Sequence, residues 1–318
     1  MVSHVDREKR DSWFTHRGVL VIAAACIVLL ILGSAHAETV KQRTFASPEE
    51  AVKAMVEAFR ANDVKALEAI LGPGSKDLVS SGDPVADQST REKFVKWYDE
   101  KNRLEQTADK AVLSVGNEDW PSPIPVVKKD GLWRFDAKAG REEILARRIG
   151  QNELSATKVC LAYVDAQREY GQKDRDGDGL LEYAQKFRSD PGKKNGLYWD
   201  VKEGEGQSPM GPLIAVAQKR GYSTKEEKPQ AFFGYYYRIL TGQGKNAPGG
   251  AYDYLVKGNM IGGFGLVAYP AKYGSSGVMT FIVNHDGVVY QKDLGRNTEK
   301  TAQAMKVFNP DSTWKKVE

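Results

Sequence analysis

The sequence contains few of the side chains that usually hold transition metals or act as nucleophiles, with two cysteines and four histidines in 318 residues. Cys26 lies in an N-terminal apolar segment, which leaves Cys160 without a partner for an internal disulfide. Cys160 falls on the apolar face of a predicted helix, where a lone cysteine packs as a small hydrophobic residue. After residue 37 the only histidine is His285, in a predicted hairpin turn, where we expect it to be exposed. Zinc sites built on several histidines are thereby excluded.

Long runs of charge are also absent. The chain has 46 Lys and Arg against 42 Asp and Glu, and the two signs are interspersed without a basic block. We therefore expect no nucleic-acid partner.

The N-terminal segment resembles an export signal. Its apolar run from Val19 to Leu32 is shorter than the roughly 20 residues that span a bilayer. It is followed by Ala35-His36-Ala37, a small-x-small pattern that signal peptidase cleaves. We predict a signal peptide over residues 1–37 and a periplasmic or secreted protein. An uncleaved anchor is the alternative, and it is the one case in which we expect the protein to be attached to a membrane.

Residues 45–139 are predicted to form helices followed by antiparallel strands. Ser47 caps the first helix, with Pro48 at its first position and Glu50 completing a capping box. Further segments are a second helix after Asn62-Asp63, a third over 90–102, and strands at 111–116, 123–129 and 132–137. Ser47-Pro48-Glu49-Glu50-Ala51, Ala61-Asn62-Asp63 and Gly131-Leu132-Trp133-Arg134-Phe135 resemble the nuclear transport factor 2-like, or cystatin-like, cone fold. In enzymes of that fold an acid or base lies inside the cone. Asp119 and Asp136 were weighed for that role and are interpreted as surface carboxylates.

Residues 140–318 are predicted to form a long helix packed on an antiparallel sheet, which makes the whole chain α+β. The helix is expected over 141–170, with a possible hinge at Gly150, and strands at 232–239, 251–256, 264–270, 278–284 and 288–294. The segments 152–156, 164–170 and 277–289 resemble the globular head of type IV pilins and pseudopilins. That resemblance implies a minor component of a pilus or type II secretion-like apparatus, although the prepilin cleavage signature is missing.

The whole chain after the signal is similar to a bacterial exported family catalogued as a domain of unknown function (number 2950). The resemblance is carried by Ala166-Gln167-Arg168-Glu169-Tyr170, the acidic loop after it, and 191–199. It implies no particular activity.

The acidic loop is the candidate metal site. Asp174, Asp176 and Asp178 occupy positions one, three and five of a calcium-loop pattern, with Gly179 at six. Leu180 would offer its carbonyl at position seven, and Glu182 stands at nine. Gln185 replaces the bidentate glutamate at position twelve, so we expect a weak structural Ca²⁺ site. The alternative is a solvated acidic turn that ends one helix and starts another.

Two functional hypotheses follow for residues 38–318. The first is an exported, non-enzymatic structural or interaction protein, stiffened by calcium, whose partner is a protein or another component of the cell envelope. The second is a small-ligand carrier or enzyme that uses the N-terminal cone. A sizeable pocket lined by inward polar groups favours the second, whereas a fully packed interior leaves only surface recognition.

Overall fold

The computed structural model describes residues 41–175, 177–201, 204–223 and 230–318, and all of them belong to one compact unit. The predicted signal peptide, residues 1–37, lies outside these ranges. No helix in the ranges is both long enough and apolar enough to cross a membrane.

The N-terminal helices begin where local capping dictates. Ser47 accepts a hydrogen bond from the Glu50 backbone N–H at 3.2 Å, as predicted for the N-cap. The Glu50 carboxylate accepts the N–H of Ala46 at 3.2 Å, one residue before the N-cap, so the reciprocal bond of the predicted capping box is displaced by one residue. The chain reverses at Asn62, in the left-handed region with φ 50°. The helices of this part are α2 (Pro48–Arg60), α3 (Val64–Leu71), α4 (Lys76–Val79) and α5 (Pro84–Glu100).

Helix α5 starts earlier than the predicted residue 90, because the buried Asp83 caps it and Pro84 occupies its first position. It also ends at Glu100, and the next residues form a strand rather than more helix. That strand, β1 (Asn102–Gln106), lies at the edge of the sheet, and most of its side chains are exposed.

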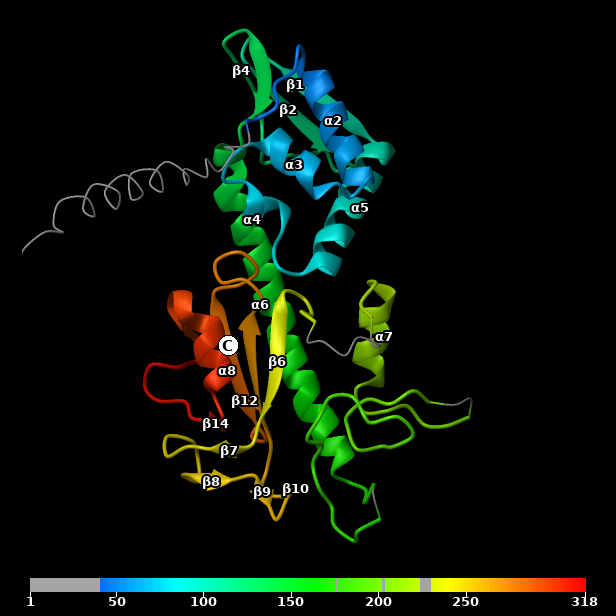
Figure 1. The fold of residues 1–318 in the computed structure, drawn as a ribbon, viewed down its shortest axis with the longest axis vertical. Coiled ribbons are helices and arrows are strands. Elements are labelled where there is room, and N and C mark those ends of the chain that lie inside the picture. The colour runs from blue at the N-terminus through cyan, green and yellow to red at the C-terminus, as the bar shows by residue number, and fades with distance from the viewer. Residues whose placement is uncertain (1–40, 176, 202–203, 224–229) are drawn as a thin grey trace, which may run out of the picture. The chain divides into compact units, whose positions relative to one another are not determined.

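The N-terminal sheet is antiparallel, with strand order β1-β2-β4-β5 and the short β3 beside β2; β1, β2 and β4 are labelled in Figure 1. Its other strands are β2 (Lys110–Val115), β3 (Trp120–Pro121), β4 (Val126–Lys129) and β5 (Leu132–Phe135). The predicted turn between β4 and β5 is confirmed, with Asp130 at φ 53° and Gly131 at φ 80°. Helices α2 and α3 pack on this sheet around a core that contains Leu67, Ile70 and Trp133.

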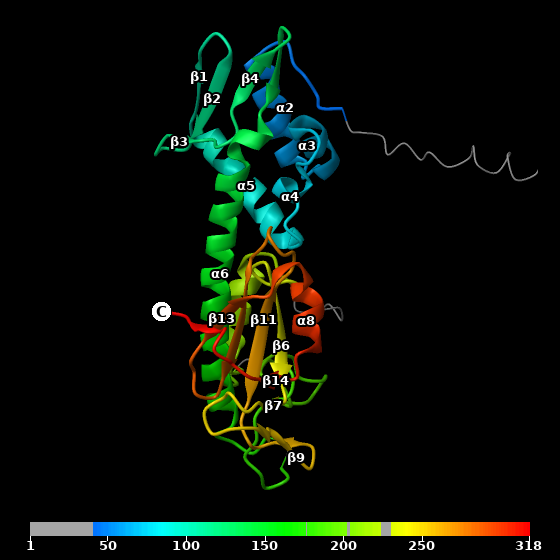
Figure 2. The same ribbon diagram turned by 90° about the vertical axis from the view of Figure 1, so that its left-hand side faces the viewer.

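Helix α6 (Ala137–Tyr170) is the longest in the described ranges. It is capped by Asp136, which accepts the Ala139 N–H at 3.2 Å, so this carboxylate has a structural role at a helix end. The helix is continuous through Gly150, where we had expected a hinge. Its first turns pack Ile144 and Leu145 against the N-terminal core, and its last turns pack against the second sheet (Figure 2).

The second sheet is antiparallel in the order β15-β13-β12-β11-β6. Its strands are β6 (Tyr235–Leu240), β11 (Gly265–Pro270), β12 (Met279–Asn284), β13 (Tyr290–Asp293) and β15 (Lys315–Lys316). The predicted turn at residues 285–287 joins β12 to β13, with Gly287 at φ 80°. Shorter elements complete this part: α7 (Gly211–Lys219), β7 (Gly242–Gln243), β8 (Tyr252–Asp253), β9 (Leu255–Val256), β10 (Asn259–Met260), the 3₁₀ helix η1 (Gly295–Asn297), α8 (Thr298–Ala304) and β14 (Val307–Phe308).

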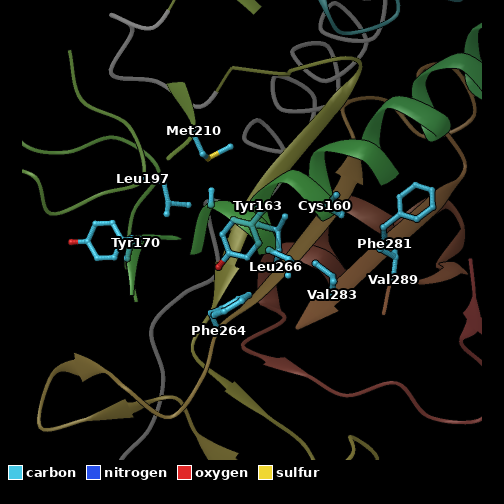
Figure 3. Packing of buried hydrophobic residues seen from close by; sticks show 14 of the residues in the cluster. Cys160, Tyr163, Tyr170, Leu197, Met210, Phe264, Leu266, Phe281, Val283 and Val289 are labelled. Atoms are coloured by element: carbon cyan, nitrogen blue, oxygen red, sulfur yellow. The ribbon is translucent and has the colours of Figure 1, made fainter. Parts of the chain in front are cut away.

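Both faces of this sheet are buried. One face meets α6 through Cys160, Tyr163, Phe264 and Phe281 (Figure 3), and the other supports a smaller core that includes Ala302 of α8. Within β6, Tyr235 and Tyr237 join the α6 side and Tyr236 joins the α8 side, as strand alternation predicts. The α+β class, with antiparallel sheets and one long helix, is confirmed.

Candidate functional site

The acidic loop forms a tight turn whose described carboxylates accept backbone hydrogen bonds. Asp174 accepts the N–H groups of Gly177 at 2.7 Å and Gly179 at 3.0 Å. Asp178 accepts the Leu180 N–H at 2.8 Å and the Asn259 side-chain amide at 3.3 Å. The unusual φ expected at Gly179 is present, at 86°. Asp176 lies outside the described residues.

The segment after this loop is not the helix that was expected there. Residues 180–187 have no helical turn, because other parts of the chain bind their backbone groups. The buried side chain of Gln167, on α6, bonds both the N–H and the carbonyl of Ala184, at 2.8 and 2.7 Å. The Tyr183 N–H donates to the Met260 carbonyl at 2.8 Å. Glu182 is half-buried in this extended segment.

No group of three or more His, Cys, Asp or Glu side chains in the described ranges is arranged to hold a metal ion. Since Asp176 is outside those ranges, calcium binding by Asp174, Asp178, the Leu180 carbonyl and Glu182 stays a prediction.

His285 is less exposed than a turn histidine was expected to be. Its side chain is 28% exposed, and Tyr254 and Phe264 meet the imidazole edge-on. Nδ1 is buried and has no hydrogen-bond partner among the described residues. The ring fits because Gly263 has no side chain, since a Cβ there would lie 2.7 Å from Nδ1.

The N-terminal part is hollow. A cavity of about 560 Å³ lies within the usual range of small-molecule sites, roughly 300–1,000 Å³. Most of its wall is apolar and comes from α2, α3, α5, β2 and the first half of α6. The apolar lining includes Val52, Met55, Phe59, Leu67, Leu71, Phe94, Trp97, Leu113, Phe135 and Ile144.

The mouth of the cavity lies between α5 and α6. Ser89 and Lys93 on α5 and Arg147 and Gln151 on α6 line the cavity, and all four are exposed to solvent. A ligand can therefore enter between these two helices without unfolding of the sheet.

Two arginines line the cavity where it approaches helix α4. Arg148 donates to the backbone carbonyls of Asp77 at 2.6 Å and Leu78 at 2.7 Å. Arg91 donates to the next carbonyl, that of Val79, and to the Asn62 side chain. The exposed carbonyls at the end of a helix carry partial negative charge, which accounts for the attraction of both guanidinium groups.

These arginines are poorly hydrated. Arg91 is only 7% exposed. Burial lowers the pKa of Arg148 from its ordinary value, and the nearby charge of Arg91 acts in the same direction, whereas Asp87 and Asp77 oppose it. Such a shift leaves the guanidinium protonated near neutral pH.

The carboxylates near the arginine end of the cavity already have hydrogen-bond or ion-pair partners. Asp77 is paired with Arg141, and Asp87, also a lining residue, accepts the Ser81 N–H at 2.9 Å. Neither Arg91 nor Arg148 has a carboxylate within ion-pair distance in the part of the chain that the structure describes. No motif in the sequence predicts this site. Asp87 and Arg91 share the helix face of Phe94, and charged residues on an otherwise apolar helix face are the pattern that could have indicated it.

The comparisons with known proteins place the chain in a family. The chain belongs to the family described as "Protein of unknown function (DUF2950)", whose model matches residues 42–317. This confirms the family resemblance of the sequence. No curated protein and no solved structure matches the chain.

Proposed function

We propose that the protein binds a small, largely apolar ligand in the N-terminal cavity and works as a carrier or sensor rather than as an enzyme. The observation that carries this proposal is the 560 Å³ cavity, because a domain of this kind ordinarily fills its interior with side chains. An unfilled, apolar hollow with a polar end and a solvent-exposed mouth is the form that binding sites take.

The proposal favours binding over catalysis because of the chemistry of the lining. It contains no histidine or cysteine, and its one carboxylate, that of Asp87, is held by a backbone N–H. Asp119 pairs with Lys101 at 2.8 Å, and Asp136 caps α6. These contacts leave neither of them in the lining to act as an acid or base.

The finer fold assignments are part of this proposal. The helices α2 to α5 beside an antiparallel sheet support a nuclear transport factor 2-like arrangement for residues 45–139. A long helix on an antiparallel sheet that ends in a hairpin supports a pilin-head-like arrangement for 140–318. We further propose that the ligand is met in the periplasm or outside the cell, on the strength of the signal pattern that ends at Ala37.

Binding is tested with the neutral dye Nile red, which fluoresces when it leaves water. We expect one dye per chain, with an affinity that falls at least about tenfold in Ala86→Trp, because Ala86 lines the cavity and a large side chain there fills it. Gln88→Trp is the matched control, since Gln88 is on the same helix, is exposed and does not line the cavity. Equal dye binding by the two variants would refute the proposal.

The structural Ca²⁺ site is a separate proposal, supported by the spacing of the loop aspartates. Calorimetric titration of the protein with Ca²⁺ should show micromolar-to-millimolar binding that is lost in Asp176→Ala. The free energy of unfolding should fall when a chelator is added. An absence of heat on titration, with equal stability in chelator, leaves the loop as a turn held by its own N–H groups.

A further inference from the structure

The charges around the inner end of the cavity do not balance. Asp77 is paired with Arg141, and among the residues that line the cavity Arg91 and Arg148 face a single carboxylate, that of Asp87. A buried arginine is seldom left without a counter-ion, because desolvation of the charge is unfavourable. Asp83 is also buried nearby, but it is not in the lining and accepts hydrogen bonds from Tyr222 and Gly234. The lining of this end therefore carries more positive than negative charge.

The two guanidinium groups bind the same short helix and lie near enough for the charge of Arg91 to act on Arg148. Their hydrogen-bond acceptors are the carbonyls of three successive residues, Asp77, Leu78 and Val79. Successive Cα atoms are about 3.8 Å apart, so both groups lie at one end of α4.

Both groups keep N–H donors for a ligand. A guanidinium has five N–H donors in a planar fork, and Arg91 donates to the Asn62 side chain and the Val79 carbonyl, which takes fewer than five. Arg148 likewise reaches two carbonyls and the Ser275 hydroxyl, the last at 3.3 Å. Planar forks match the oxygens of a carboxylate or a phosphate.

Two exposed cationic residues at the mouth of the cavity also favour an anionic ligand. Lys93 and Arg147 line the cavity near solvent, so four of the lining side chains are cationic and one, Asp87, is anionic. This field draws an anion toward the opening. The apolar wall between the mouth and the arginines has no partner for a charge.

We propose that the ligand is an amphiphilic anion, with a carboxylate or phosphate head bound by Arg91 and Arg148 and an apolar body in the hollow. This inference rests on the proposed binding function and adds the chemical class of the ligand. The two head groups share the chemistry of an oxyanion joined to a hydrocarbon.

The test is displacement of Nile red from the full chain by probes of equal chain length: decanoate, decyl phosphate, decanol and decyltrimethylammonium. We expect decanoate or decyl phosphate to bind at least about tenfold more tightly than decanol, because hydrogen bonds to a charged group are among the stronger ones in proteins. The better of the two anions identifies the head group. Equal binding of decanol, or tighter binding of the ammonium probe, would overturn the inference and leave the binding function intact.

If none of the probes and no dye binds, the binding function itself fails. Inorganic phosphate is a further arm. If inorganic phosphate binds as tightly as decyl phosphate, the hydrocarbon chain contributes nothing to the affinity. The ligand is then a free oxyanion, and the proposal of an amphiphilic ligand is wrong.

Arg148→Gln should bring the ratio of decanoate to decanol affinity close to one, and Arg148→Lys should restore part of it. Lys158→Gln is the matched control, because Lys158 is an exposed cation on the same helix and is not among the residues that line the cavity. A folded Arg148→Gln that keeps the wild-type ratio contradicts the assignment. If Arg148→Gln does not fold, the wild-type ratio and the Arg148→Lys variant decide.

Discussion

Replacement of Asp83 by alanine removes a carboxylate that joins distant parts of the chain. Asp83 caps α5 by accepting the Ala86 N–H at 3.0 Å. Its other oxygen accepts the Tyr222 hydroxyl and the Gly234 N–H, both at 2.8 Å. The Asp83 side chain is fully buried, and Tyr222 is 6% exposed, so water cannot readily replace these bonds.

The magnitude follows from these contacts. Loss of the helix cap costs about 1 kcal/mol, and each buried donor left without an acceptor costs about 1–3 kcal/mol. Part of this loss of stability is offset, because the variant no longer buries a carboxylate. Desolvation is the largest influence on the Asp83 carboxyl and raises its pKa, which shows that the buried charge is unfavourable. We therefore expect the free energy of unfolding to fall by about 3 kcal/mol, a large share of the 5–15 kcal/mol typical of folded proteins.

Asp63→Ala is the matched control. Asp63 caps α3 by accepting the Ala66 N–H at 3.0 Å, the same bond at the same distance, but on the surface. We expect that variant to lose only about 1 kcal/mol. Urea unfolding followed by circular dichroism measures both variants, with a constant slope as evidence that the unfolding transition is unchanged. Equal losses would mean that the bonds to Tyr222 and Gly234 contribute nothing, and the reasoning would be refuted.

Two further predictions use the same unfolding measurement, and a third uses chemical labelling. Burial raises the pKa of the Asp83 carboxyl above its ordinary 3.8. The contribution of Asp83 to stability is therefore present in full below pH 3.8 and is lost as the pH rises through the folded-state pKa. The free energy of unfolding of the wild type should accordingly fall relative to that of Asp83→Asn over this pH range, and a constant difference would contradict the prediction. Gly150→Ala should raise the free energy of unfolding by about 0.5–1 kcal/mol, since nothing lies within 4 Å of a Cβ there. Gly140→Ala should lower it by about 1–3 kcal/mol, because its Cβ would lie 2.4 Å from the Pro123 carbonyl oxygen; the same sign for both glycines contradicts this account. Burial raises the pKa of Cys160 to about 12, so iodoacetamide should label it only in denaturant, and rapid labelling of the folded protein would show that the thiol is accessible.

The sequence predicted those elements whose cause is local. Ser47 and Glu50 cap their helix through neighbouring atoms, Asp130-Gly131 provides the positive φ values of a tight turn, and the tyrosines of β6 alternate by strand geometry. The edge strand β1 was missed because its side chains are mostly exposed and give no apolar alternation. The early start of α5 is indicated by Asp83-Pro84, an N-cap residue followed by proline at the first helical position. The apolar pattern used to predict this helix begins only after these two residues.

Elements whose cause is distant were not predictable in this way. Residues 180–187 are extended because Gln167 and Met260 bind their backbone, which no local pattern records. The polar end of the cavity is formed by Arg91 and Arg148, which are far apart in the sequence and are brought to the same helix by the three carbonyls of α4 that they bind. The His285 ring is partly enclosed because Gly263 lies against it, a contact between the segment before β11 and the turn after β12.

The continuity of α6 has a practical consequence for dissection of the protein. Ile144, Arg147, Arg148, Gln151 and Asn152 all line the cavity, and all of them follow residue 139. A truncated polypeptide covering only 45–139 would therefore lack the α6 wall of the cavity. Its apolar lining would be exposed to water, and the polypeptide would tend to self-associate. The smallest piece that retains the whole wall of the cavity must extend past Asn152, into the turns of α6 that need the second sheet for their own burial.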